Sequence, residues 1–257
     1  MFSIQHFIWL GICAVLVAAF MVYYDKNKPD LTRILDYACV ICVLSEVIKV
    51  LSVLEYVPSS DGSLMRPYLP MNHLPLHLCS IQILFIFYVR YSENVKIRKL
   101  LLALMYPTCL LGAIAALAMP SIFSTSISVS QAFTHPMAYQ FFCFHTMLIC
   151  LGLAIAKSGE IDWKWKNYFD TLKLFFVIAF LSLYINSIFA SPTYVDGKLV
   201  SVDFWPNFFF TYNNPLNIPM SKMWHWYIYM AILIALVIVL TALCFYPVIR
   251  KNKKKNG

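Results

Sequence analysis

The sequence predicts an all-α, polytopic membrane protein, built as a bundle of seven transmembrane helices. Two observations predict this class. Hydrophobic residues make up 61% of the 257 positions and charged residues only 12%, which leaves more apolar surface than a soluble fold can bury. The apolar residues are also gathered into long runs between short polar segments. We therefore expect a single transmembrane domain over residues 1–257, without a separate soluble domain or an internal repeat.

Seven apolar runs are candidates for membrane-spanning helices. A spanning helix needs about 20 mainly apolar residues to cross about 30 Å of hydrocarbon. The runs cover residues 4–24, 32–54, 74–90, 98–118, 136–157, 167–190 and 224–249. The first has no basic residue before it, so it is predicted to be a retained helix rather than a cleaved signal peptide. The third is the shortest, so its polar start is predicted to lie inside the protein.

The basic residues predict the orientation of the bundle. The loops after the first, third and fifth helices, together with the C-terminal tail, hold sixteen of the 20 Lys and Arg residues. By the positive-inside rule these regions are cytoplasmic, which places the N-terminus outside and the C-terminus inside. The net charge of +8 suits anionic lipid headgroups and does not require a nucleic-acid partner.

Polar residues recur at one depth of the predicted bundle. In this orientation they fall in the outer half of the membrane, and they are Glu46, Lys49, His77, Cys79, Gln82, His145, Asn186 and His225. A titratable group at the bilayer centre costs at least ~2.5–3.5 kcal/mol if it faces lipid. Several such groups from different helices predict a shared polar cavity that opens to the outside.

Cys79 and His145 are the candidates for catalysis in this cavity. Of the eight cysteines, only Cys79 lies beside histidines and a glutamine, and the others are predicted to be buried hydrophobic side chains. A thiol becomes a nucleophile when a nearby base takes its proton. On a regular helix His77 would point away from Cys79, whereas His145 lies at a compatible depth on another helix. A His145 that is only hydrogen-bonded to a backbone carbonyl or to Asn186 is the alternative.

Two other chemistries compete with this interpretation. His73 and His77 are spaced i, i+4, which could bind zinc from one helix face, but Pro75 between them favours a cap or loop position for His73. No metal or cofactor is therefore predicted. Glu46 and Lys49 could form an intramembrane ion pair that serves a transporter, or one that only stabilises the bundle. Against transport, the second half of the chain does not repeat the first.

Several stretches carry a resemblance to known proteins. They are HLPLHLCSIQILF, YPTCLLGAIAALAMPSI, FTHPMAYQFFCFHTMLICLG, INSIFASPTYV and the pair Trp224 and Trp226. With them the chain resembles the YwaF-type family of bacterial integral membrane proteins. That family is similar to a eukaryotic transmembrane family that remodels phospholipids with a cysteine and a histidine, and more distantly to the androgen-induced serpentine hydrolases. The resemblance implies a multi-pass protein of the bacterial plasma membrane, with Cys79 as nucleophile and His145 as the histidine.

The predicted function is a lipid acyltransferase that works through a thioester. A site that opens away from the cytoplasm has no access to acyl-CoA, so a membrane phospholipid is the expected acyl donor. The acceptor would be a lysophospholipid, a glycolipid, a lipoprotein or water, and water would make the protein a lipid hydrolase. A transporter with an outward polar vestibule and a non-enzymatic scaffold are the alternatives. The sequence does not predict the oligomeric state.

Supporting roles are expected for the remaining polar residues. The backbone N–H groups at the start of the third helix, or the amides of Gln82 and Asn186, would stabilise the oxyanion. The other positions would orient the pair or contact headgroups, and they are His77, Glu46, Lys49 and His73. His225 lies between two tryptophans and is more typical of an interfacial anchor. The aromatic loop 191–223 is expected to be an interfacial lid or a structural segment.

Overall fold

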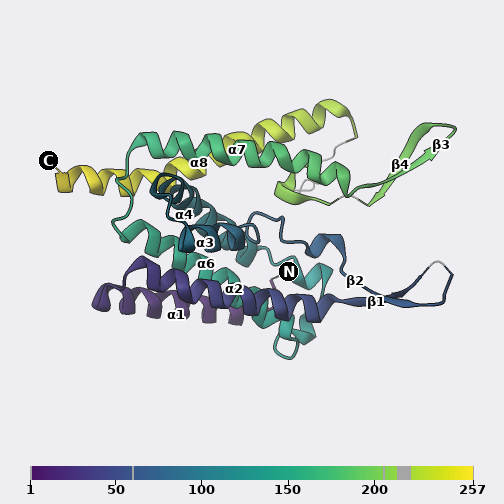
Figure 1. The fold of residues 1–257 in the computed structure, drawn as a ribbon, viewed down its shortest axis with the longest axis horizontal. Coiled ribbons are helices and arrows are strands. Elements are labelled where there is room, and N and C mark those ends of the chain that lie inside the picture. The colour runs from purple at the N-terminus through teal and green to yellow at the C-terminus, as the bar shows by residue number, and fades with distance from the viewer. Residues whose placement is uncertain (1, 60, 205, 213–220, 257) are drawn as a thin grey trace. The chain divides into compact units, whose positions relative to one another are not determined.

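The computed structural model describes residues 2–59, 61–204, 206–212 and 221–256, and it is mostly helical (Figure 1). The α-helices are α1 Ile4–Asn27, α2 Leu31–Val53, α3 Gln82–Tyr91, α4 Val95–Ala118, α5 Ile122–Thr125, α6 Pro136–Lys157, α7 Trp165–Ile188 and α8 Met223–Asn256. The strands are β1 Glu55–Pro58, β2 Met65–Tyr68, β3 Ser191–Val195 and β4 Lys198–Phe204. Short 3₁₀ helices are η1 Met71–His73, η2 Val129–Gln131 and η3 Phe208–Phe210.

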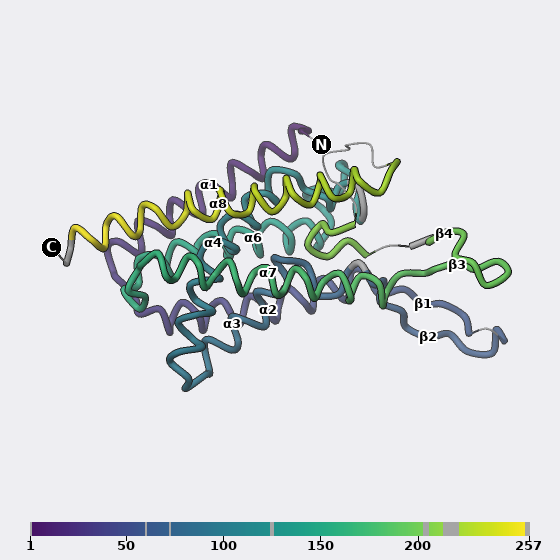
Figure 2. The backbone as a smooth tube through the Cα atoms, turned by 90° about the horizontal axis from the view of Figure 1, so that it is seen from above, coloured from purple at the N-terminus to yellow at the C-terminus, as the bar shows by residue number. Residues whose placement is uncertain are grey.

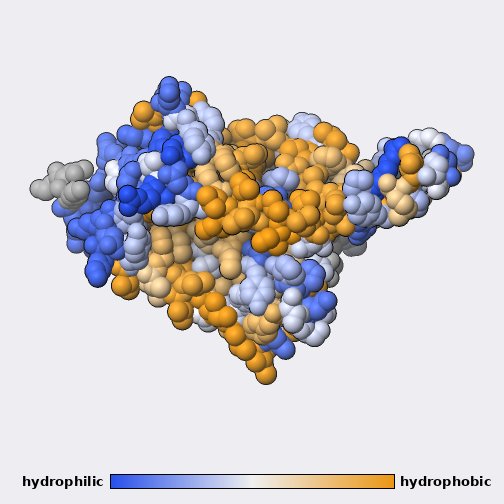
Figure 3. Space-filling view, turned by 60° about the horizontal axis from the view of Figure 1, so that its bottom comes forward, coloured by the Kyte–Doolittle hydropathy of each residue, from blue (hydrophilic) through white to orange (hydrophobic). Residues whose placement is uncertain are grey.

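Five helices are long and apolar enough to cross a membrane, namely α1, α4, α6, α7 and α8. The chain is therefore a membrane protein with several apolar helices. Helix α2 has 23 residues but carries several charges, and α3 has only 10 residues. Large hydrophobic side chains are exposed along most of these helices, and they cover much of the face drawn in Figure 3. The seven-span bundle and its orientation stay predictions.

The prediction of a helix over 74–90 is wrong in its first half. Residues 74–81 form turns, and α3 begins only at Gln82. Pro75 explains part of this difference, because proline lacks an N–H and disfavours a helical residue before it. Cys79 consequently lies on a turn, where its carbonyl oxygen accepts the Gln82 N–H at 3.3 Å. The expectation that His77 must point away from Cys79 assumed a helix that is absent at these residues.

The expected all-α class omits two β-hairpins. β1 pairs with β2 after the end of α2, and β3 pairs with β4 after the end of α7; each hairpin projects from the helix that precedes it (Figure 2). The turn between β3 and β4 has positive φ at Asp196 and Gly197, as a tight hairpin turn requires. Asp-Gly was thus an available hairpin signal. β3 and β4 occupy the first part of the expected lid 191–223, whose residues 205 and 213–220 lie outside the described part.

The described chain forms two compact units. The first comprises the residues up to Pro75 and Cys79–Asp162, and the second comprises Leu76–Leu78 and the residues from Trp163 onwards. In the first unit, α6 packs against α1, α2 and α4, and α3 packs against α2 and α4. In the second unit, α7 packs against α8 and η3. Helix α6 therefore lies in contact with most of the long helices of its unit.

Candidate functional site

The structure distributes the expected site residues over both units. Cys79, Gln82, His145, Glu46, Lys49 and His73 belong to the first unit, and His77, Asn186 and His225 belong to the second. The proposed catalytic pair therefore lies within one unit, and each unit can be described by itself.

His145 is buried on α6 with one ring nitrogen held by its own helix. Its Nδ1 lies 2.7 Å from the carbonyl oxygen of Phe141. A carbonyl oxygen can only accept, so Nδ1 carries the hydrogen and Nε2 keeps its lone pair. The rings of Phe141 and Phe144 flank the imidazole, with centroids at 4.4 and 5.5 Å. The alternative that His145 is hydrogen-bonded to a backbone carbonyl therefore holds for Nδ1. The other nitrogen, Nε2, can still accept a proton.

Cys79 is a half-buried free thiol on the turn before α3. Within the described residues no hydrogen bond joins its sulfur to His145. The two side chains nevertheless come from elements with shared neighbours, because α3 and α6 both pack against α2 and α4. The structure thus places the thiol and the imidazole in one helix cluster, with no hydrogen bond between them among the described residues.

Gln82 links the start of α3 to α4. Its side chain is fully buried, and its Nε2 donates to the hydroxyl of Thr108 at 3.1 Å. The Cys109 thiol donates to Gln82 Oε1 at 3.4 Å, while Thr108 donates onward to the Leu104 carbonyl at 2.7 Å. This network fixes the helix that begins three residues after Cys79. Sequence reasoning missed Thr108 and Cys109, although Pro107 and a threonine within an apolar helix were a signal for polar packing.

Replacing Gln82 with Leu is expected to destabilise the protein by about 1–3 kcal/mol, because the Cys109 thiol loses its acceptor and Thr108 loses a donor. Thermal unfolding in detergent measures this loss. Gln140→Leu is the matched control, since it removes a single glutamine hydrogen bond, from Gln140 Nε2 to Ser45 at 2.6 Å. An equal or larger loss in the control would contradict a special role for the Gln82 network.

Glu46 and Lys49 form the ion pair expected on α2. Their side chains meet at 2.7 Å, and the Lys49 side chain is only 9% exposed. His73, at the end of η1, lies within electrostatic range of Lys49. Partial burial, and then the Lys49 cation, lower the pKa of His73, while Glu55 opposes the shift. Burial and the Lys49 cation therefore both favour the neutral form of His73 over its protonated form.

No group of three or more His, Cys, Asp or Glu side chains within the described residues is arranged to hold a metal ion. His73 and His77, considered above as a zinc pair, belong to different units.

Sequence reasoning also missed His6 on α1, which is fully buried and whose Nε2 lies 2.8 Å from the Leu117 carbonyl. A histidine within the first apolar run was the available signal.

Asn186 holds a loop in the second unit. Its Nδ2 donates to the Phe208 carbonyl at 3.0 Å and to the Thr211 hydroxyl at 2.7 Å, and its Oδ1 accepts the Phe208 N–H at 3.0 Å. Both amide hydrogens are therefore used within the fold, so Asn186 positions η3 rather than offering a donor to an oxyanion. The His77 ring meets the Phe208 ring edge-on at 4.9 Å, beside the same loop.

His225 packs edge-on against Trp224 at the start of α8, with ring centroids 3.9 Å apart. Trp226, on its other side in the sequence, donates its indole N–H to the Thr211 carbonyl at 2.9 Å. Trp226 thus ties α8 to the loop that Asn186 holds. The anchoring role of His225 at the membrane interface stays a prediction.

Comparison with known proteins identifies the family. A model of the TMEM164 family matches residues 1–245, which include the turn that carries Cys79, the histidine of α6 and most of α8. No curated protein and no solved structure matched the chain. The resemblance to YwaF-type proteins and the distant relation to serpentine hydrolases stay predictions. Because the match covers nearly the whole sequence, the chain belongs to the TMEM164 family.

Proposed function

We propose that this protein is a membrane-embedded acyltransferase that takes a fatty acyl group from a phospholipid onto Cys79 and passes it to a second acceptor. One observation carries the proposal: Phe141 fixes His145 Nδ1 as the donor at 2.7 Å, so Nε2 is left as a base in the same unit as a free thiol. Membership of the TMEM164 family, which is transmembrane Cys/His acyltransferase-like, supports the proposal.

The reaction consists of two proton-coupled halves. His145 Nε2 takes the proton of the Cys79 thiol, and the thiolate attacks the ester carbonyl of the phospholipid. The tetrahedral oxyanion collapses, the ester C–O bond breaks, and the lysophospholipid leaves with the proton from His145. In the second half His145 takes a proton from the acceptor alcohol or amine, which attacks the thioester. The C–S bond then breaks and the thiol recovers its proton.

The geometry sets one requirement on this mechanism. No hydrogen bond joins the Cys79 sulfur to His145 within the described residues, so the proposed reaction requires the reacting atoms to come within about 3–3.5 Å of one another when the ester is bound. The first N–H groups of α3 already donate to the carbonyls of Cys79, Ser80 and Ile81. The proposed mechanism would also require one of these donors to be released for the oxyanion.

The substrate class follows from the predicted orientation. If the basic loops are cytoplasmic, the outer ends of α2 and α6 face away from acyl-CoA, and a phospholipid of the surrounding membrane is the donor. The polar residues of α2, Glu46 and Lys49, would contact its headgroup. Transfer to water by the same steps would make the protein a lipid hydrolase. The family resemblance favours the bacterial plasma membrane as its location.

Intact mass spectrometry after brief incubation with phospholipid tests the proposal. The wild type is expected to carry a hydroxylamine-labile acyl adduct that maps to Cys79, and Cys79→Ala is expected to carry none. Cys143→Ala is the matched control, because Cys143 is an exposed thiol outside the site and its loss should leave the adduct in place. An adduct that persists in folded Cys79→Ala, or no adduct on the folded wild type with several lipids, would overturn the proposal.

A transporter is the second candidate, and the Glu46–Lys49 pair is the observation in its favour, since a lysine that is only 9% exposed is costly within a membrane. Flux into proteoliposomes separates the two functions. A transporter is expected to lose flux in Lys49→Met and to retain it in Cys79→Ala, whereas the acyltransferase is expected to lose its adduct in Cys79→Ala.

A further inference from the structure

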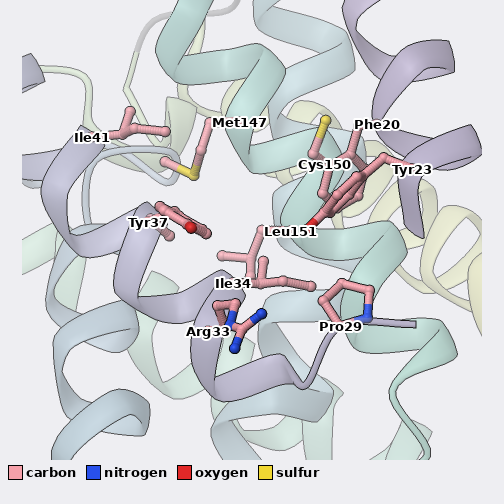
Figure 4. A pocket seen from close by; sticks show the side chains of 11 residues that line it. Phe20, Tyr23, Pro29, Arg33, Ile34, Tyr37, Ile41, Met147, Cys150 and Leu151 are labelled. Carbon is pink, nitrogen blue, oxygen red and sulfur yellow. The ribbon is translucent and has the colours of Figure 1, made fainter. Parts of the chain in front are cut away.

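The first unit contains a groove that the proposed reaction does not use. Its volume is about 410 Å³, within the range of sites that bind small ligands. The walls come from α1, α2 and α6 and are almost entirely apolar, with Phe20, Tyr23, Ile34, Tyr37, Met147 and Leu151 around the space (Figure 4). Neither Cys79 nor His145 lines it. The groove is therefore a separate feature of the same helix cluster.

Arg33 supplies the charge of this groove. Figure 4 shows its guanidinium at the edge of the space, next to Ile34 and Pro29. Arg33 makes no ion pair with any residue that the structure describes.

Three cations of the same unit are paired with carboxylates, whereas Arg33, like Lys26 and Lys28, makes no ion pair with a described residue. The pairs are Arg98 with Glu160 at 2.7 Å, Lys157 with Asp25 at 2.7 Å, and Arg90 with Asp36. These pairs join helices or loops of the bundle to one another. Arg33 is an exposed residue near the start of α2, so its guanidinium can meet a ligand at the edge of the groove.

We infer that this groove binds one anionic phospholipid of the membrane, with an acyl chain along Ile34 and Leu151 and the phosphate on Arg33. A guanidinium forms two parallel hydrogen bonds with phosphate oxygens, and the hydroxyls of Tyr23 and Tyr37 stand at the same space. A phosphate that no headgroup cation balances is favoured over a zwitterionic one. Basic pockets between helices on the cytoplasmic side of a membrane bind anionic lipids in this way.

The bound lipid would hold α1 against α2 and α6. At the groove the three helices leave an apolar gap beside their packed contacts, and an acyl chain would fill that gap with the contacts that a void lacks. On the predicted orientation, Arg33 lies in the inner leaflet, and the groove reaches only Ile41 on α2 and Met147 on α6. The lipid is thus a structural ligand, and the inference does not rest on the acyl-transfer chemistry.

Native mass spectrometry tests the inference with equal concentrations of dioleoyl phosphatidylglycerol and dioleoyl phosphatidylcholine. The wild type and Cys79→Ala are expected to retain one intact phosphatidylglycerol in preference to phosphatidylcholine. Arg33→Gln is expected to lower that preference about fivefold, the factor for one Arg charge at an anionic surface. Lys26→Gln, with the same loss of charge in an exposed residue outside the groove, is the matched control. Equal preference in Arg33→Gln and Lys26→Gln would overturn the inference.

Cys150 supplies a second measurement on the protein in vesicles. Its thiol lines the groove, so a bound chain is expected to slow its alkylation by N-ethylmaleimide when phosphatidylglycerol is added to phosphatidylcholine vesicles. Cys143, an exposed thiol on the same helix, is the internal control and should not change. Protection that is absent, or that persists unchanged in Arg33→Gln, would contradict a phosphate-anchored lipid in this groove.

Discussion

Replacing His145 with Gln is expected to lower the rate of acyl-adduct formation by about 10²–10⁴-fold, the usual contribution of a positioned general base. The glutamine amide can donate to the Phe141 carbonyl, as His145 Nδ1 does at 2.7 Å, but it cannot take a proton from a thiol. The substitution thus removes the base and retains the local hydrogen bond. Single-turnover measurement of the adduct on Cys79 by mass spectrometry determines the rate.

Thr146→Val is the matched control for this experiment. Thr146 is the next residue on α6 and also bonds its own helix, with its hydroxyl 2.7 Å from the Phe142 carbonyl. Its loss removes a buried hydrogen bond of the same kind without removing a base, so the adduct rate should stay near that of the wild type. A folded His145→Gln protein that forms the adduct at the rate of Thr146→Val would exclude His145 as the base.

The helices could be predicted well because long apolar runs have one structural solution in a membrane. The run 136–157 coincides with α6, whose start is marked by Pro136 and by the His135 side chain that accepts the Met137 N–H at 3.2 Å. The predicted end of a helix was less accurate where charged residues follow the apolar run. Helix α8 continues to Asn256 through the basic tail, because a charge ends the apolar span and does not end the helix.

The candidate site could be predicted only as a set of residues. Cys79 and His145 stand out in the sequence because a thiol beside polar residues and a histidine in an apolar run are unusual. The contacts that define them could not be predicted, since helices that are apolar on every side give no periodicity from which to infer the face toward a neighbour. The bond from Gln82 to Thr108 at 3.1 Å depends on such a rotation.

The crossing of α4 and α6 depends on Gly152. A Cβ atom at this position would lie 2.8 Å from Leu110 Cγ and 3.2 Å from the Tyr106 carbonyl oxygen, both on α4. Small residues permit this close approach of helices in membranes. Gly152→Ala is therefore expected to destabilise the protein by about 1–3 kcal/mol, the cost of overpacking, despite the better helix propensity of alanine. Thermal unfolding in detergent measures the change.

Gly11→Ala is the control for this substitution, because no atom lies within 4 Å of a Cβ at that position, and only the gain in helix propensity is expected there. Leu110→Ala should lessen the cost of Gly152→Ala in the double variant, since the closest contact is with the Leu110 side chain. Equal effects of Gly11→Ala and Gly152→Ala would show that the two helices are not closely packed. Helix α4 carries the Thr108–Cys109 network and α6 carries His145. If Gly152→Ala pushes these helices apart, the variant is therefore expected to form the acyl adduct more slowly as well as to lose stability.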